Sequence, residues 1–297
     1  MRILVTGATS QTGSLAVRAL AGEGHGARCL IRSDEGRRFL PRAGVEFVRG
    51  DLEQPETLVA ALDGIEAVAQ FAHIRFAPAL MGACEKAGVR RVVFLSSTRR
   101  FTQFDSPSAR QVRDGESAIE AGPLDYTILR PSMIYGSRRD NNISRLIAYL
   151  RRHRVFPLVG GGKNLVQPVF TLDVVAALLE ALKRPATIRR SYTLAGPEAL
   201  TYRRMIETIG EALGRRVTMP TVPLGPTLLA VRLYETVVRR PRVTSEQIQR
   251  LGEDKAFDIA PARQDVAFCP LAFPEGIRRQ IAGEVDAMWA EANLDRK

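Results

Sequence analysis

The most constraining feature of this sequence is a glycine-containing loop that begins at residue 7, between a short apolar run and an amphipathic segment. Ile3–Val5 is typical of a buried strand, and Gly13–Ala21 has the periodicity of a helix. Gly7 lets the chain turn sharply out of the strand, and Gly13 lets the helix pack closely on the sheet. The free amides at a helix start bind pyrophosphate. The loop therefore predicts a dinucleotide site formed by Gly7, Thr9, Ser10, Gln11, Thr12 and Gly13.

Ser10 stands where the middle glycine of a G-x-x-G-x-x-G pattern would lie. Serine has less backbone freedom than glycine, but its hydroxyl can bond a phosphate oxygen. The alternative interpretation is a glycine turn with a purely structural role.

The first half of the chain alternates short β-branched runs with helical segments, which is the signature of βαβ units and a parallel sheet. Right-handed crossovers predict a doubly wound α/β fold of the Rossmann type, with ligand at the carboxyl ends of the strands. The expected strands are Ile3–Val5, Ala27–Ile31, Glu46–Arg49, Ala67–Phe71, Arg91–Leu95 and Tyr126–Arg130, and the expected crossover helices are Gly13–Ala21, Pro55–Leu62, Ala77–Lys86 and Asp114–Glu120.

Beyond Gly136 the pattern loosens, and from Gly196 onward it is punctuated by proline. We expect a smaller, mostly helical lobe across the strand ends. The division assigns residues 1–135 with 166–196 to the dinucleotide-binding domain and 136–165 with 197–297 to the smaller lobe. The elements expected after Gly136 are helices Asn142–Arg152, Thr171–Lys183, Tyr202–Leu213, Thr227–Val238, Ser245–Leu251 and Glu275–Ala292 and a strand at Ser191–Leu194.

The end of the second expected strand indicates which dinucleotide is bound. Proteins that prefer NAD usually place an acidic residue there for the ribose hydroxyls, whereas this chain has Arg32. A guanidinium suits a 2′-phosphate, and Ser33 can add a hydroxyl contact. Asp34 and Glu35 follow closely and keep NAD(H) as the alternative. We expect NADP(H).

The composition narrows the possible classes of protein by indicating whether a metal site, a signal peptide or a membrane span is expected. The three cysteines and three histidines are widely spaced, which predicts reduced thiols and no metal site. Met1 and Arg2 lead straight into the first strand, so no signal peptide is expected. No stretch reaches the ~18 unbroken apolar residues of a spanning helix. These features predict a cytoplasmic protein.

The formal net charge of +11 raises the question of an anionic partner. The basic residues are mostly scattered pairs, and only residues 151–154, Arg-Arg-His-Arg, form a small cluster. A solvated basic surface is the simpler interpretation; no nucleic-acid module is recognisable. The segment Pro223–Pro241 is apolar and ends in Arg239 and Arg240. It predicts a lid over the substrate cleft or, as the less favoured alternative, a helix on a membrane surface.

Motifs along nearly the whole chain resemble the extended and atypical short-chain dehydrogenase/reductase (SDR) superfamily, including its epimerase/dehydratase-like members. They are Thr6–Thr9 with Gly13, Gly50–Leu52, Leu95–Thr98, Leu129–Gly136, Thr171–Val174 and Tyr192–Gly196. The tail motifs Thr244–Gln247, Asp265–Pro270 and Phe273–Gly276 resemble epimerase-like and complex-I-subunit-like members. The resemblance implies adenine contacts from Asp51 and Leu52, cofactor-lining positions at Phe71, Ala72, His73 and Ser96, and nicotinamide contacts from Pro131, Ser132 and Ile134.

The sequence departs from the family at its catalytic pair. Catalytic members use a Tyr-x-x-x-Lys dyad in which the lysine lowers the pKa of the tyrosine. The family's helix glutamate matches Glu116, which places the tyrosine position at Ser108 and the lysine position at Val112. Thr98 does match the family's catalytic Ser/Thr. The loss of the dyad points to atypical branches, such as NmrA-like nucleotide sensors and NADPH-dependent quinone or dye reductases.

Two functions remain open. One is an NADPH-dependent reductase of a quinone-like or carbonyl compound, with Thr98 and Tyr135 as the candidate catalytic groups. The other is a sensor or scaffold that binds NADP(H) without turnover and docks on a protein or membrane. A sugar-nucleotide epimerase is disfavoured because it needs the missing acid–base pair.

Overall fold

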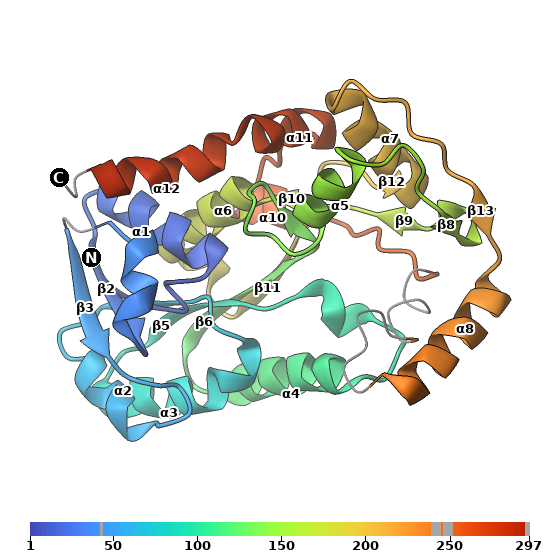
Figure 1. Ribbon diagram of the computed structural model, residues 1–297. Helices are drawn as coiled ribbons and strands as arrows, with labels where there is room; N and C mark the ends of the chain where they lie inside the picture. The colour runs from blue at the N-terminus through green and yellow to red at the C-terminus, as the bar shows by residue number, and fades with distance from the viewer. Residues whose placement is uncertain (42–43, 239–244, 246–251, 295–297) are drawn as a thin grey trace.

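A seven-stranded sheet forms the centre of the computed structural model, which describes residues 1–41, 44–238, 245 and 252–294 (Figure 1). The strand order is β3-β2-β1-β4-β5-β6-β11, and each pairing is parallel. This confirms the doubly wound Rossmann-type fold. The strands are β1 (Arg2–Thr6), β2 (Gly26–Ile31), β3 (Val45–Arg49), β4 (Ala67–Gln70), β5 (Arg91–Leu95), β6 (Asp125–Pro131) and β11 (Arg190–Leu194).

Helices cover both faces of the sheet. In Figure 1, α1 and α6 lie on one face, while α2, α3 and α4 lie on the other. These helices are α1 (Gln11–Gly22), α2 (Glu56–Ala61), α3 (Ala77–Ala87), α4 (Pro107–Ala121) and α6 (Thr171–Lys183).

The apolar strands contribute side chains to two hydrophobic cores, one on each face of the sheet, because successive side chains of a strand point to opposite faces. In β1, Ile3 and Val5 belong to the core under α1 and α6, whereas Leu4 belongs to the core under α2–α4. In β5, Val93 joins the first core and Val92 the second. A strand buried on both faces reads as a continuous apolar run, which is why the parallel sheet could be predicted.

The remaining elements include the segments after β6 and after β11, which leave the sheet at the carboxyl ends of those strands. Helices α5 and α11 both pack against α7. The last helix, α12, returns to the phosphate-loop helix, where the Trp289 indole donates to the Ser14 hydroxyl at 3.0 Å. The proposed division into two domains stays a prediction. These elements are β7 (Ile134–Tyr135), α5 (Ile143–Leu150), β8 (Leu158–Val159), β9 (Leu165–Val166), β10 (Val169–Phe170), β12 (Leu200–Thr201), α7 (Tyr202–Ala212), β13 (Thr221–Val222), α8 (Leu224–Val237), α10 (Ala260–Asp265), α11 (Phe273–Ala282) and α12 (Glu284–Leu294), and short 3-10 turns at η1 (Asp34–Phe39), η2 (Ile74–Phe76), η3 (Thr98–Phe101), η4 (Gly160–Gly162) and η5 (Pro185–Thr187).

Two helix predictions differ from the structure. The helix expected at Asp114–Glu120 begins earlier, at Pro107, with the Ser106 hydroxyl capping its first turn. The single helix expected at Glu275–Ala292 is instead α11 and α12, separated by Gly283 at φ +79°. A left-handed glycine ends a helix readily because it has no Cβ. The helix expected at Ser245–Leu251 and the tail motif Thr244–Gln247 lie outside the described residues, except for Ser245.

Within the described ranges, no helix is long and apolar enough to cross a membrane.

Candidate cofactor and substrate site

The loop after β1 has the geometry that its glycines predict. Gly7 has φ +65°, and a Cβ there would lie 2.5 Å from the backbone nitrogen of Ala72. Ser10 caps α1, because its hydroxyl accepts from the Gly13 amide at 3.1 Å. A Cβ on Gly13 would lie 2.3 Å from the carbonyl oxygen of Gly7. The loop's own compactness, rather than the packing of helix on sheet, therefore requires glycine at position 13.

A cavity of about 380 Å³ opens over this loop at the carboxyl ends of β1, β2, β3 and β4. It brings together residues that the sequence predicts for cofactor binding from four separate segments. Its lining also includes Arg75 and Phe76, which the sequence analysis missed. The predicted residues in the lining are Gly7, Thr9, Ser10, Arg32, Asp51, Leu52, Phe71, Ala72 and His73.

Three other residues predicted to contact the cofactor, Gln11, Thr12 and Ser33, are not among those that line this cavity. The Thr12 hydroxyl lies 3.4 Å from that of Thr171, which directs it toward α6. Ser33 precedes η1 without capping it. The Gln11 side chain leaves its amide nitrogen buried with no hydrogen-bond partner among the described residues. A buried donor without an acceptor costs free energy, so an anionic group at the α1 start would satisfy it.

Cationic groups surround the loop. The Arg139 guanidinium donates to the Thr9 carbonyl at 2.8 Å and lies 3.8 Å from the centre of the Phe39 ring. Burial, followed by the charges of Arg75 and Arg99, lowers the pKa of His73 below its usual range. His73 is therefore neutral at neutral pH. The positive charges of Arg75, Arg99 and Arg139 favour an anion in this region.

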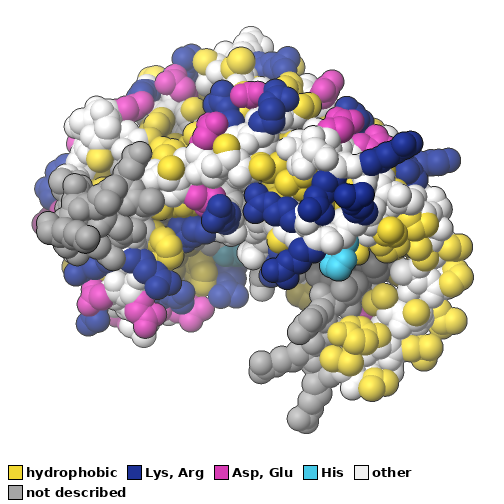
Figure 2. Space-filling model, turned by 45° about the horizontal axis from the view of Figure 1, so that its top comes forward, with side chains coloured by type: hydrophobic (Ala, Val, Ile, Leu, Met, Phe, Trp, Pro, Cys, Tyr) yellow, Lys and Arg dark blue, Asp and Glu magenta, His cyan; other side chains and the backbone are white. Residues whose placement is uncertain are grey.

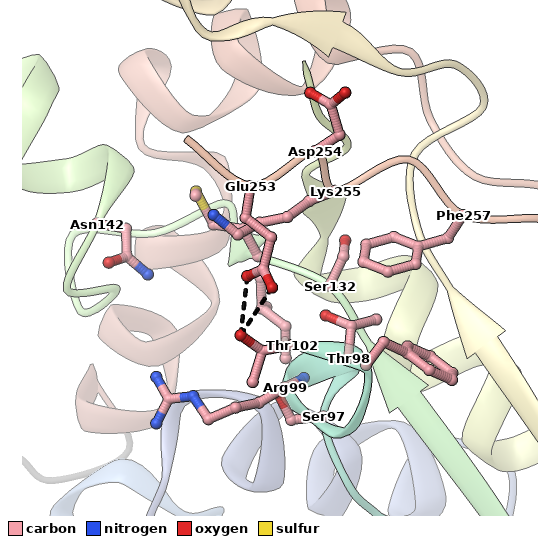
Figure 3. A pocket seen from close by; sticks show the side chains of 13 residues that line it. Ser97, Thr98, Arg99, Thr102, Ser132, Asn142, Glu253, Asp254, Lys255 and Phe257 are labelled. Atoms are coloured by element: carbon pink, nitrogen blue, oxygen red, sulfur yellow. Dashed lines mark hydrogen bonds between the residues drawn. The ribbon is translucent and has the colours of Figure 1, made fainter. Parts of the chain in front are cut away.

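A second cavity, of about 430 Å³, opens beyond β5 and β6 (Figure 3). Thr98, Ser132 and Ile134 line it, as the sequence predicts for residues near the nicotinamide and substrate. The rest of the lining is polar and partly aromatic. It comprises Ser97, Arg99, Phe101, Thr102, Met133, Asn142, Glu253, Asp254, Lys255 and Phe257.

The far wall of this cavity comes from a segment about which the sequence analysis made no statement. Both Glu253 carboxylate oxygens accept from the Thr102 hydroxyl at 2.9 Å, and one accepts from the Gln103 amide at 2.7 Å. Phe257 faces Phe101, with ring centroids 5.9 Å apart. Segment 253–257 carries no local motif, so only the tertiary fold reveals its position.

Comparisons with known proteins identify the class. Residues 7–148 match a family model described as NAD(P)H-binding. An NAD(P)H azoreductase from Xenophilus azovorans is 28% identical over 75% of this chain and 77% of its own. The photosystem II assembly factor Ycf39 of Synechocystis is 25% identical over 91% of this chain and 86% of its own. A UDP-glucuronic acid 4-epimerase from Bacillus cereus, solved with UDP-glucuronic acid and NAD, superposes with a TM-score of 0.76 at 17% identity, over 97% of this chain and all of that one.

Residues 7–148 therefore match an NAD(P)H-binding domain, and the chain as a whole is similar to atypical SDR proteins.

In this SDR-like protein the helix glutamate is part of a buried polar network. Glu116 is fully buried and accepts hydrogen bonds from the Ser96 hydroxyl and from Arg130 at 2.7 Å, while Arg100 lies 3.1 Å away. Ser96 was predicted to line the cofactor, but its hydroxyl is used within this network. Pro131 ends β6 and is buried. The network fixes α4 against β5 and β6 beside the second cavity.

The family resemblance assigns the dyad positions to Ser108 and Val112. Ser108 shares a 3.2 Å hydroxyl contact with Ser106, and Val112 is buried in the core. Neither residue lines the second cavity.

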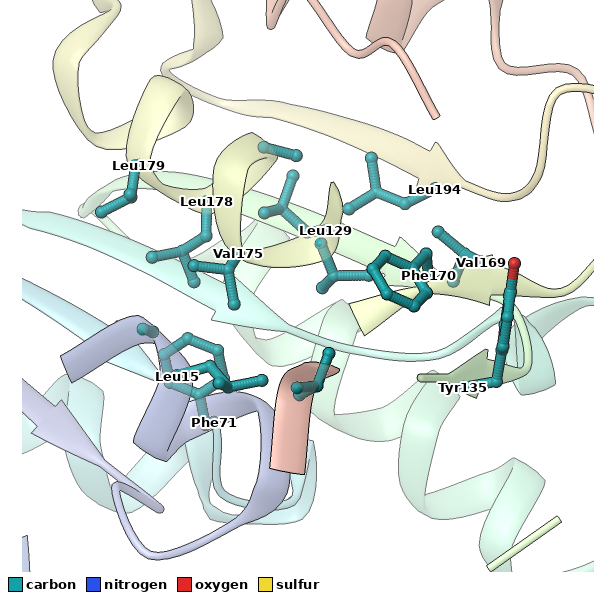
Figure 4. Packing of buried hydrophobic residues seen from close by; sticks show 14 of the residues in the cluster. Leu15, Phe71, Leu129, Tyr135, Val169, Phe170, Val175, Leu178, Leu179 and Leu194 are labelled. Atoms are coloured by element: carbon teal, nitrogen blue, oxygen red, sulfur yellow. The ribbon is translucent and has the colours of Figure 1, made fainter. Parts of the chain in front are cut away.

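Tyr135 lies in the core of this SDR-like protein and outside both cavities (Figure 4). Its ring packs against Phe170 and Phe273, with centroids 5.5 and 5.2 Å away. Burial, with a further contribution from Asp173, raises the pKa of its hydroxyl above the usual range. A fully buried phenol cannot reach a substrate, so the expectation of a catalytic Tyr135 is corrected to a packing role.

Proposed function

We propose that the protein is an NADPH-dependent reductase of a quinone-like or carbonyl small molecule. The second cavity carries this proposal because it adjoins the Pro131–Ile134 segment and contains Thr98. A substrate there would lie beside the position that the family resemblance gives to the nicotinamide. The named azoreductase activity of one relative supports the same class of reaction.

The preference for NADPH rests on Arg32. Its side chain lines both the cofactor cavity and an adjoining hollow that also contains Arg49 and Asp51. Within the described part of the chain, the Arg32 guanidinium makes no hydrogen bond or ion pair, whereas Arg49 lies 3.9 Å from Asp34. A 2′-phosphate would give Arg32 the partner that the protein does not supply.

A reductase without the Tyr-Lys dyad needs few catalytic groups from the protein. When bound, a nicotinamide would supply the hydride, and water would supply the one proton that completes reduction of a quinone to a hydroquinone. Thr98 would donate a hydrogen bond to the substrate oxygen and hold it in place. Phe101 and Phe257 would form apolar walls for a flat acceptor.

A second candidate function is a non-catalytic NADP(H)-binding scaffold or sensor. Ser108 and Val112 at the dyad positions favour it, and one relative is named as an assembly factor.

Turnover distinguishes the two functions. We expect purified protein to oxidise NADPH in the presence of a quinone, an azo dye or an aromatic aldehyde, followed by NADPH absorbance. Thr98→Val should reduce turnover about 100-fold, in the range of a lost catalytic hydrogen bond. Thr98→Ser, which keeps the hydroxyl, should retain most activity. Tight NADPH binding with slow release and no turnover of any acceptor would reject the reductase and favour the scaffold.

A further inference from the structure

Helix α8 exposes an unusual row of aliphatic side chains. Leu229, Leu233 and Val237 follow one another at intervals of four residues, which places them on one side of the helix. Their exposed fractions are 62%, 60% and 84%, and no residue of α8 is buried. We call these three residues the apolar stripe. Helix α8 lies at the edge of the molecule (Figure 1), and none of its residues lines the second cavity. The lid role expected for this segment stays a prediction.

Two arginines at helix α5 lack a counter-ion among the described residues: Arg145 on the helix and Arg151 at its C-cap. Arg145 and Arg151 line a cavity of about 430 Å³ together with Arg138 and Gln280. Arg138 lies 3.8 Å from Asp286, but the side chains of Arg145 and Arg151 have no ion pair or hydrogen bond in the described ranges. Gln280 is 4% exposed, and its side-chain oxygen lacks a partner there. We call this cavity the arginine pocket.

The segment that carries Arg145 and Arg151 contains no acidic residue of its own. From residue 141 to residue 172 the sequence contains no aspartate or glutamate, although it has the basic turn Arg151–Arg154 and Lys163. Asp140 is buried, and its carboxylate accepts from the amides of Asn142 and Ser144. Unbalanced positive charge on one face attracts an anionic partner.

A short strand pair connects the basic turn to α8. Val155, directly after the turn, forms a parallel bridge with Thr218, and the Leu158 amide donates to the Pro220 carbonyl at 2.9 Å. β13 then leads through Pro223 into α8. The basic turn and the start of α8 therefore lie at opposite ends of one strand pair, which is about five residues or roughly 16 Å long. Figure 2 shows basic and hydrophobic side chains gathered next to each other on this face.

We propose that this face docks on an anionic phospholipid membrane. The apolar stripe enters the headgroup boundary while the arginine pocket and the basic turn bind lipid phosphates. A convex, protruding aliphatic helix beside basic residues is the pattern of an interfacial helix. Protein interfaces instead concentrate Trp, Tyr and Arg in flat, well-packed patches. In the sequence, α8 is followed by two further basic residues, Arg239 and Arg240.

Flotation of the full-length protein tests this proposal. Vesicles of phosphatidylcholine alone are compared with an equimolar mixture of phosphatidylcholine and phosphatidylglycerol. We expect flotation with the anionic vesicles at low salt, little with the neutral vesicles, and weaker flotation as salt screens the surface charge. NADPH binding, measured in the same samples, reports that each variant is folded and is independent of lipid binding.

Two variants separate the contributions. Leu229→Asp combined with Leu233→Asp should reduce vesicle affinity at least about tenfold, because the inserted apolar area is lost. Arg151→Glu should reduce it about tenfold, since each basic residue near an anionic surface contributes roughly fivefold and reversal adds repulsion. Val59→Asp and Lys86→Glu, at exposed positions on α2 and α3, are the matched controls and should bind as wild type.

Absence of flotation with anionic vesicles, or flotation that the stripe variant leaves unchanged, overturns the proposal. A concentration-dependent dimer that the stripe variant abolishes would overturn it in favour of a second copy of this chain.

Discussion

Some buried polar side chains have hydrogen-bond partners and others have none, and this difference separates the roles of Glu116 and Tyr135. The Tyr135 hydroxyl is buried without a hydrogen-bond partner in the part of the chain that the structure describes. A Cβ at Gly276 would lie 2.0 Å from this oxygen, so the glycine makes room for the ring. The Glu116 carboxylate, by contrast, is surrounded by donors. Tyr135 therefore contributes packing, and Glu116 holds α4 and β6 together.

Replacing Tyr135 with phenylalanine should not destabilise the protein. Tyr135→Phe removes an unsatisfied buried hydroxyl while keeping the ring contacts with Phe170 and Phe273. We expect the free energy of unfolding in urea to stay unchanged or rise by about 1 kcal/mol. NADPH binding should be unaffected. A loss of more than 2 kcal/mol in stability would show that the hydroxyl is satisfied in solution.

Glu116→Gln should be strongly destabilising. It leaves the Arg130 guanidinium, which is 12% exposed, without its buried counter-charge, and we expect a loss of about 3 kcal/mol in the free energy of unfolding. Glu120→Gln is the matched control, because Glu120 also pairs with Arg130 but is 38% exposed and should cost less than about 1 kcal/mol. Equal costs for the two variants would contradict the account of the network.

At the scale of elements, the turn between β1 and α1 sets the cofactor site. Gly7 is left-handed and touches the backbone after β4, whereas Gly22, the last residue of α1, has open space around it. The two glycines thus differ in what a methyl group would meet.

We expect Gly7→Ala to lower stability by about 2 kcal/mol and to abolish nucleotide binding, because the strained φ and the contact with Ala72 distort the loop. Gly22→Ala should be neutral or stabilising by up to about 1 kcal/mol in a helix. Thermal unfolding with and without NADPH measures both effects. Wild-type nucleotide binding by Gly7→Ala would refute the loop geometry.

The sequence allowed the central sheet to be predicted because buried parallel strands form continuous apolar runs. It did not reveal where α4 begins, since the Ser108–Arg113 stretch is too polar for a clear apolar stripe. Similarly, Gly283 splits the last expected helix although the apolar periodicity continues on both sides. A local sequence pattern indicates only weakly where a helix begins, ends or is interrupted.

The lining of the first cavity was largely predictable from the sequence, and the lining of the second cavity only in part. The residues around the phosphate loop belong to motifs with a fixed relation to the strand ends. Glu253, Lys255 and Phe257, however, reach the second cavity from about 150 residues beyond Thr102, in a segment without a motif. Tertiary contacts of this kind leave no local signal in a single sequence.

At the scale of the whole molecule, the two cavities lie along one edge of the sheet, while α8 and the basic turn form a separate surface. The first cavity joins residues after β1, β2, β3 and β4, and the second joins residues after β5 and β6. This arrangement suits a nucleotide that extends along the strand ends with its reactive end toward Thr98.

Titration of the protein with NADPH and with NADH, followed by nucleotide fluorescence, tests the central claim most directly. We expect NADPH to bind about tenfold or more tightly than NADH, the value of one charge-assisted contact to a 2′-phosphate. Arg32→Ala should remove this preference and leave NADH affinity unchanged, while Arg37→Ala, which removes an exposed guanidinium paired with Asp34, should bind as wild type. Failure of the wild-type protein to bind either nucleotide would contradict the account.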